Sequence, residues 1–155
     1  MDIFTVSLFG HREIEDLREL DKRLSPLIRN LIKSKEYISF LIGRNGEFDE
    51  YAASVIKHEI KVHSENNCDI TLILPYEVAN IEYYDKYYDN IIIPEALSNA
   101  HHKKAMTLRN RWMIEASDLV ICYILRESGG AFRAMKYAKA INKPYINIHE
   151  EPYLF

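Results

Sequence analysis

The stretch Asp118-Leu-Val-Ile-Cys-Tyr-Ile-Leu125 decides the fold, together with the turn Arg126-Glu-Ser-Gly-Gly130 and the helical pattern that follows it. Its first part is a continuous apolar run with β-branched and aromatic members, which is typical of a strand buried on both faces. From Ala131 onward, apolar residues recur at helical spacing, and Asn142 before Pro144 marks the end of a helix. The stretch therefore predicts a strand, a glycine turn and a helix.

The turn Ser128-Gly129-Gly130-Ala131 joins this strand to this helix. Glycine lets the backbone approach a ligand closely, and the N–H groups of a first helical turn point at whatever binds there. We therefore expect these four residues to hold a phosphate or a similar anion. The alternative is that the two glycines only turn the chain. Farther along the helix, the spacing predicts that Arg133 faces outward.

Strands and helices alternate along the rest of the chain. Further strands are expected at Ile3–Phe9, Tyr37–Ile42, Cys68–Leu74, 91–93 and Tyr145–Ile148. Further helices are expected from Leu17 to Leu31 with Ser25-Pro26 kinking or dividing it, from Phe48 to Ile60, and from Ser98 or Asn99 to about Ser117. This order predicts an α/β fold, a Rossmann-like, doubly wound, mainly parallel sheet with helices on both faces. We expect residues 1–155 to form one such domain.

The five glycines of the chain all follow predicted strands. They are Gly10, Gly43, Gly46, Gly129 and Gly130. The C-terminal ends of parallel strands lie at one edge of a sheet, where ligands bind in folds of this type. Tight turns alone explain some of these positions, because glycine is favoured wherever the backbone turns sharply. Three glycine-bearing turns on one edge nevertheless favour a shared ligand crevice.

Polar residues near these turns are candidate ligand contacts. Arg12 offers a planar fork that binds two oxygens of a phosphate or carboxylate, unless it is simply solvated. His11 is either an acid or base or a loop hydrogen-bonding group. Arg109 falls on the apolar stripe of its helix, so it needs a carboxylate, a carbonyl or a ligand anion, whereas Arg111 is expected to be solvated. Asp49 stands in a first helical turn, where it either complements the helix dipole or accepts from a ribose hydroxyl or base edge.

Composition limits the classes of function. The chain has 155 residues, 48% of them hydrophobic, and a formal charge of -3. Because Lys and Arg are spread along it, we expect no nucleic-acid partner. No apolar run is long enough to cross a membrane and no signal peptide is visible, so we expect no membrane partner and a cytoplasmic location. Cys68 and Cys122 are expected to be buried free thiols, and His101-His102 lacks further ligands, so neither a metal nor a cofactor is predicted.

A tyrosine-rich segment carries paired tyrosines at Tyr83, Tyr84, Tyr87 and Tyr88. Such rings serve as a lid that stacks on a base, or as a contact between two copies of the chain. The alternative is a cluster that packs beneath a long loop.

Four segments, taken in order, resemble the SLOG superfamily, which contains LOG-type phosphoribohydrolases, Smf/DprA DNA-processing proteins and small YpsA-like proteins. The segments are Gly10-His-Arg12, Gly43-Arg-Asn-Gly-Glu-Phe-Asp49-Glu-Tyr-Ala-Ala53, Arg109-Asn-Arg-Trp-Met113 with Ser117-Asp118, and Ser128-Gly-Gly-Ala131. The likeness spans nearly the whole chain and is greatest to the YpsA-like branch. The resemblance implies a Rossmann-like fold that binds a nucleotide or a nucleotide-derived ligand.

The resemblance departs from the LOG-type enzymes at the residues that are implied to cleave a glycosidic bond. Those enzymes carry Arg-x-x-x-Met before Ser-Asp, and then Pro-Gly-Gly-x-Gly-Thr-x-x-Glu. Arg109 and Met113 match the first motif, but Ser128 replaces the proline, and Lys136 stands at the position of the glutamate. The resemblance therefore places the hydrolytic activity in doubt.

We accordingly expect a homodimeric sensor or regulatory module that binds a nucleotide-like small molecule. One alternative is a phosphoribohydrolase acting on nucleoside monophosphates, with Asp49, Glu115 or Glu127 as the carboxylate that assists cleavage. A second alternative is a DNA-processing module, against which the acidic balance of the chain argues.

Overall fold

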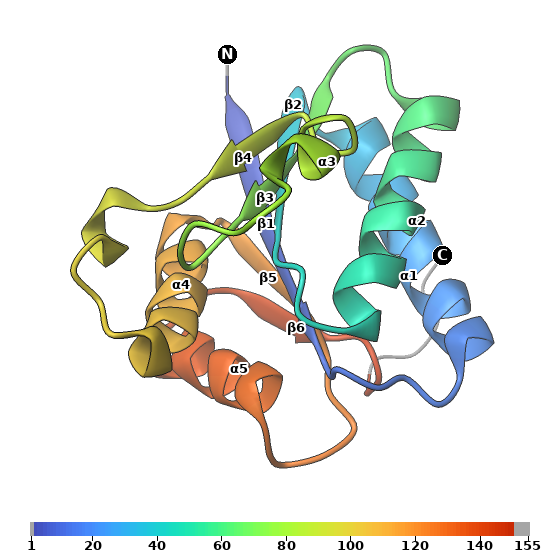
Figure 1. The fold of residues 1–155 in the computed structure, drawn as a ribbon. Coiled ribbons are helices and arrows are strands. Elements are labelled where there is room, and N and C mark those ends of the chain that lie inside the picture. The colour runs from blue at the N-terminus through green and yellow to red at the C-terminus, as the bar shows by residue number, and fades with distance from the viewer. Residues whose placement is uncertain (1, 151–155) are drawn as a thin grey trace.

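A computed structural model of the chain describes residues 2–150, and its strands form one parallel sheet (Figure 1). In chain order the elements are β1 (Ile3–Gly10), α1 (Leu17–Ser34), β2 (Tyr37–Ile42), α2 (Glu47–His63), β3 (Cys68–Ile73), α3 (Ile81–Asp85), β4 (Asn90–Ile92), η1 (Glu95–Leu97), α4 (His102–Ala116), β5 (Leu119–Tyr123), α5 (Gly130–Ala140) and β6 (Tyr145–Asn147). Neighbouring strands are parallel in the order β4-β3-β2-β1-β5-β6. The predicted Rossmann-like α/β fold is confirmed.

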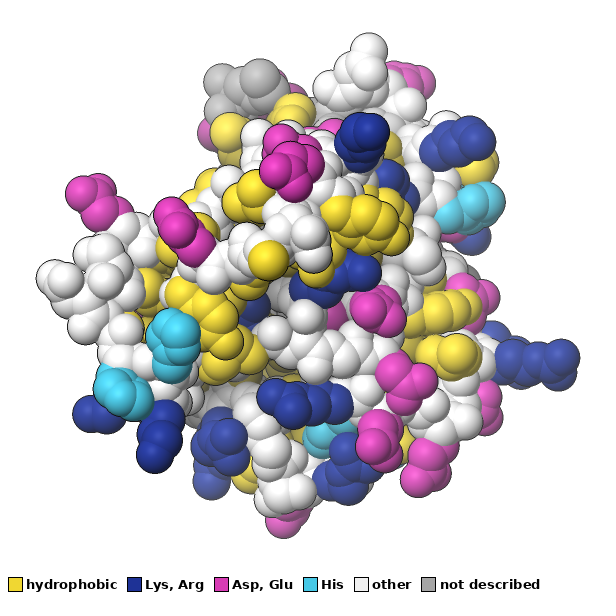
Figure 2. All heavy atoms as spheres, viewed as in Figure 1, with side chains coloured by type: hydrophobic (Ala, Val, Ile, Leu, Met, Phe, Trp, Pro, Cys, Tyr) yellow, Lys and Arg dark blue, Asp and Glu magenta, His cyan; other side chains and the backbone are white. Residues whose placement is uncertain are grey.

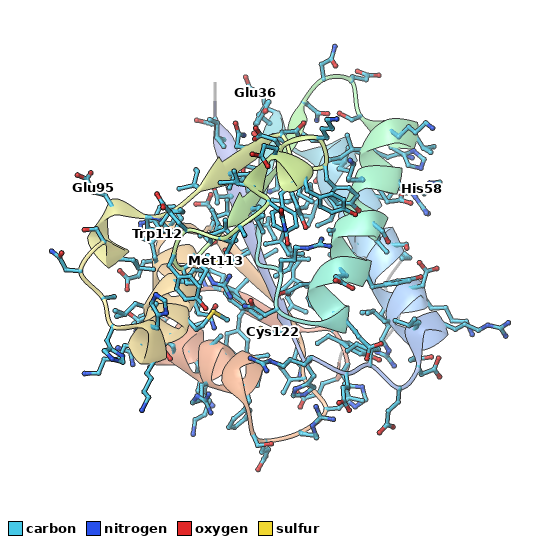
Figure 3. The ribbon with its side chains drawn as sticks, viewed as in Figure 1. Glu36, His58, Glu95, Trp112, Met113 and Cys122 are labelled. Carbon is cyan, nitrogen blue, oxygen red and sulfur yellow. The ribbon has the colours of Figure 1, made fainter. Side chains whose placement is uncertain are left out.

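The hydrophobic core has two layers, because alternate side chains of each strand point to opposite faces of the sheet. One layer lies beneath α1 and α2, and it includes Leu8 and Ile42. The other lies beneath α4 and α5, and it includes Met113 and Cys122 (Figure 3). Burial raises the pKa of the Cys122 thiol to about 12. The same figure shows the outward-pointing side chains of Glu36, His58 and Glu95.

Two helices differ from their predicted form. Pro26 lies inside α1, which continues without division, because its apolar face is held against the sheet at residues on both sides of the proline. Helix α4 begins after Ser98 and Asn99, not at them, because the chain there closes the 3₁₀ turn η1 and the turn that follows. The cap of α4 is His101, whose Nδ1 accepts from the N–H of Lys103 at 3.2 Å.

The direction in which strands are added reverses at β1. The sheet grows from β1 through β2, β3 and β4 on one side, whereas β5 and β6 add on the other side. The loops that follow β1 and β5 lead to α1 and α5, which lie on opposite faces (Figure 1). Gly10 at the end of β1 pairs with Tyr123 at the end of β5. The two loops therefore start side by side, at the position where this fold class forms its ligand crevice.

Gly10 is required by packing at this position. A Cβ at Gly10 would overlap the ring of Phe48, which is fully buried beneath the sheet edge. The ring can lie against the backbone of β1 only because Gly10 has no side chain.

We expect Gly10→Ala to lower the free energy of unfolding by about 1–3 kcal/mol, since the added methyl group must displace the Phe48 ring within a filled core. The matched control is Gly130→Ala, because a Cβ at Gly130 meets only Nη2 of Arg133, at 4.0 Å. Urea denaturation of both variants measures the difference. A Gly10→Ala variant as stable as the parent would show that Phe48 moves aside without cost.

Candidate functional site

A cavity of about 480 Å³ lies at the C-terminal edge of the sheet, between the loops that follow β1, β2 and β5 and helices α4 and α5. This volume lies within the range of small-molecule pockets. The predicted site residues that line it are Gly10, His11, Arg12, Gly46, Asp49, Arg109, Ser128, Gly129, Gly130 and Ala131. Gly43 is the predicted site residue that does not line it.

Arginine side chains dominate the lining of the cavity. The described lining residues include Arg12, Arg109, Arg111, Arg126 and Arg133, and Asp49 is their one carboxylate. Figure 2 shows Lys and Arg side chains gathered along the part of the surface that carries α4 and α5. Arg111 and Arg133 were expected to face solvent, and they are exposed, but they also border the cavity. Arg111 lies 4.9 Å from the centre of the Tyr137 ring, on which its guanidinium stacks.

The first turn of α5 presents backbone N–H groups that have no acceptor within residues 2–150. Gly129 precedes this turn with a φ of 91°, which favours glycine, and it offers no side-chain cap. A Cβ built on Gly129 has nothing within 4 Å. The N–H groups of Gly130 and Ala131 lie in the first turn, where no intrahelical partner exists. They are therefore available to an anion.

The first turn of α2, by contrast, is occupied by the protein itself. The N–H of Glu47 donates to the carbonyl of Arg12 at 2.8 Å, and the N–H of Phe48 donates to the carbonyl of His11 at 3.4 Å. Of the helix N-termini that follow the glycine turns, the one of α5 is therefore the candidate anion site.

Arg12 is held at the rim of the cavity by its backbone. A Cβ on Gly46 would lie 2.5 Å from Cα of Arg12, so Gly46 allows the loops after β1 and β2 to touch. The side chain of Arg12 remains exposed, as do those of Arg126 and Arg133. Within residues 2–150, none of these three guanidinium groups forms an ion pair.

His11 ties the loop after β1 to the loop after β5. Its side chain is buried, and its Nε2 accepts from the N–H groups of Leu125 at 3.1 Å and Arg126 at 3.2 Å. Accepting at Nε2 requires the neutral ring with its proton on Nδ1. Burial, and then the charge of Arg126, lower the pKa of His11. Of the two predicted roles, the geometry matches the loop hydrogen-bonding group.

We expect acid to weaken the fold through His11. Because its pKa is lowered on folding, the contribution of the neutral ring is complete above the unfolded pKa of about 6.5 and is lost as the pH falls below it, by at most about 1.4 kcal/mol per pH unit. His11→Gln keeps an acceptor without the titration. Urea denaturation at pH 7 and pH 5 should show a smaller loss in this variant. Equal losses would show that His11 is not the responsible group.

Arg109 joins the ends of three elements from a buried position. Only 3% of its surface is exposed. Its Nη1 donates to the carbonyl of Ile73 and its Nε to Oδ1 of Asn110, both at 2.9 Å. In the amide orientation that satisfies both groups, the side-chain oxygen of Asn45 accepts from Nη2. Gly43 makes room for this arrangement, since a Cβ there would lie 2.5 Å from Nη1.

Asp49 lies at the same inner end of the cavity and is 9% exposed. Its Oδ2 accepts from the N–H of Asn45 at 2.9 Å, and no group within residues 2–150 donates to its Oδ1. Burial raises the pKa of Asp49, although that bond and the charge of Arg109 oppose the shift. Burial likewise lowers the pKa of Arg109 against the attraction of Asp49. Asp49 therefore offers a poorly solvated oxygen to a ligand that carries a hydroxyl or amino group.

The tyrosine-rich segment packs beside the cavity without lining it. Tyr88 is buried in the core, its hydroxyl accepts from Arg44 at 3.2 Å, and the Arg44 guanidinium lies 4.9 Å from the centre of the Tyr84 ring. These contacts match the interpretation as a packing cluster. Within residues 2–150, no group of three or more His, Cys, Asp and Glu side chains is placed to hold a metal ion. No helix in that range is long and apolar enough to span a membrane.

No family model and no curated protein matches the sequence. Solved structures do share its fold. DNA processing protein A (DprA) from Streptococcus pneumoniae superposes with a TM-score of 0.66 at 13% identity, over 92% of this chain and 49% of that one. DprA from Helicobacter pylori, described by its single-stranded DNA binding mode, gives 0.62 at 16% identity, over 92% and 63%. The Moco carrier protein of Chlamydomonas rheinhardtii gives 0.56 at 13% identity, over 93% and 74%.

These likenesses show the fold, which is the SLOG-type fold that the resemblance implied. The chain spans about half the length of the Streptococcus protein and under two thirds of the Helicobacter protein. Placement in the YpsA-like branch stays a prediction. The expectation of no nucleic-acid partner is wrong, because a protein of this fold binds single-stranded DNA. The net charge misled that expectation, since it averages over the chain whereas the arginines gather around one cavity.

Proposed function

We propose that the protein binds a nucleotide in this cavity, with a phosphate on the N–H groups of Gly130 and Ala131. The proposal rests on the uncapped first turn of α5, which stands among unpaired arginines. The helix dipole and the free N–H groups favour an anion there, and guanidinium forks match phosphate oxygens. Binding of this kind, without chemistry, suits a sensor or regulatory module.

The remainder of the nucleotide extends toward the inner end of the cavity. There Asp49 accepts from a ribose hydroxyl or from an amino group of the base. Asn45 and Asn110 line the same region, and an amide both donates and accepts. A cationic end and an acceptor end correspond to the two ends of a nucleotide.

Gly130→Asp should lower the affinity for nucleotide at least about tenfold while the fold stays intact. The added carboxylate occupies the anion site, and Nη2 of Arg133, 4.0 Å from the new Cβ, is in reach to pair with it. Gly130→Asn is the matched control, because it has the same size without the charge. Calorimetry with AMP, GMP, CMP and UMP measures both. Equal affinities in the two variants would place the phosphate elsewhere.

Cleavage of an N-glycosidic bond is the alternative activity, and it requires a carboxylate near the sugar. Asp49 is the one carboxylate among the described lining residues. Glu115 accepts from the hydroxyl of Tyr137 at 2.6 Å, whereas Glu127 and Lys136 are exposed and do not line the cavity. The position that matches the LOG-type glutamate therefore supplies no acid.

We expect little or no release of free base from AMP, GMP, CMP or UMP, because Asp49 alone would have to stabilise the sugar cation and direct water. Chromatography of the incubated nucleotides measures the release. A turnover near the ~10 s⁻¹ typical of enzymes would contradict the binding-module proposal. Loss of that turnover in Asp49→Asn would then assign the chemistry to Asp49.

Single-stranded DNA is a second candidate ligand, favoured by the excess of arginine around the cavity and by the fold shared with the Helicobacter protein. A strand would place one phosphate on the turn of α5 and its neighbours along the exposed arginines. Affinity that rises with oligonucleotide length and falls steeply with salt would favour the strand over a free nucleotide.

A further inference from the structure

The charges of the cavity do not balance against a single phosphate, and this inference rests on the proposed function. At the inner end, Arg109 and Asp49 offset each other, and Arg109 spends its hydrogen bonds on protein acceptors. The remaining lining arginines are Arg12, Arg111, Arg126 and Arg133. A phosphate monoester carries about -1.5 to -2 at pH 7, so it would neutralise about half of these charges.

These arginines come from two sides of the cavity. Arg133 belongs to α5, and its Nη2 lies 4.0 Å from a Cβ position on Gly130, beside the free N–H groups. Arg12 and Arg126 belong instead to the loops after β1 and β5, which His11 holds together. A phosphate on the turn of α5 therefore meets Arg133 and leaves the loop pair, Arg12 and Arg126, without an anion.

The cavity also contains a second feature that calls for a ligand. Oδ1 of Asp49 has no donor within residues 2–150, although the side chain is nine-tenths buried and lines the inner wall. A ligand that satisfies this oxygen and both arginine groups needs a hydrogen-bond donor and two anionic groups. The volume of about 480 Å³ admits such a molecule.

We propose that the ligand is a nucleoside diphosphate. One phosphate lies on the N–H groups of Gly130 and Ala131 beside Arg133, and the other lies between Arg12 and Arg126. Guanidinium groups bind phosphate oxygens through charge-assisted hydrogen bonds, so the second phosphate adds contacts that a monophosphate lacks.

Calorimetry with AMP and ADP, and with the matching pairs of guanosine, cytidine and uridine nucleotides, tests the proposal. For the base that binds, the diphosphate should bind at least about tenfold more tightly than the monophosphate. In the double variant Arg12→Ala/Arg126→Ala, the diphosphate should bind no more tightly than the monophosphate. The backbone bonds of both residues to Glu47 and His11 survive this change.

Lys136→Ala is the matched control, because Lys136 is an exposed cation on α5 that does not line the cavity. It should retain the preference for diphosphate. Equal binding of monophosphate and diphosphate by the parent protein would overturn this inference and leave the proposed function standing. Binding of none of these nucleotides would overturn both. A preference that survives in the double variant, or that Lys136→Ala weakens equally, would overturn the placement of the second phosphate.

Discussion

The carbonyl groups of His11 and Arg12 accept hydrogen bonds from the first turn of α2, and the candidate site depends on this backbone contact. It satisfies N–H groups that would otherwise need solvent or an anion. It also brings the loop after β1 against the loop after β2, which Gly46 permits by having no Cβ. With His11 held in this way, its ring reaches the N–H groups of Leu125 and Arg126 in the loop after β5. One loop thus closes one helix terminus and positions the approach to the other.

The electrostatics of the site follow from where charge is buried. Arg109 and Asp49 lie deep, and burying either charge is costly, as the direction of each pKa shift shows. Neutral acceptors from three elements surround Arg109 and offset part of that cost. The arginines nearer the surface have no such partners and keep their charges available. The cavity is therefore nearly balanced at its inner end and cationic at its outer end.

The sequence predicted the features that depend on local pattern. The strands from Ile3 and Tyr37 begin where expected, and the parallel sheet follows from alternation of strands and helices. The roles of Gly10 and Gly43 could not be predicted, because each is set by a side chain distant in the chain. Arg133 was missed because helical periodicity separates buried from exposed positions, and an exposed side chain can still border an open cavity.

The central claim is that a phosphate sits on the first turn of α5 and not on that of α2. Titrating ¹⁵N-labelled protein with AMP and then with ADP, and following each backbone amide by NMR, tests it most directly. The account predicts saturable shifts that are largest at Gly130 and Ala131, with Glu47 and Phe48 nearly unmoved because their N–H groups already donate to His11 and Arg12. Saturable shifts centred on Glu47 and Phe48, with Gly130 and Ala131 unchanged, would contradict it.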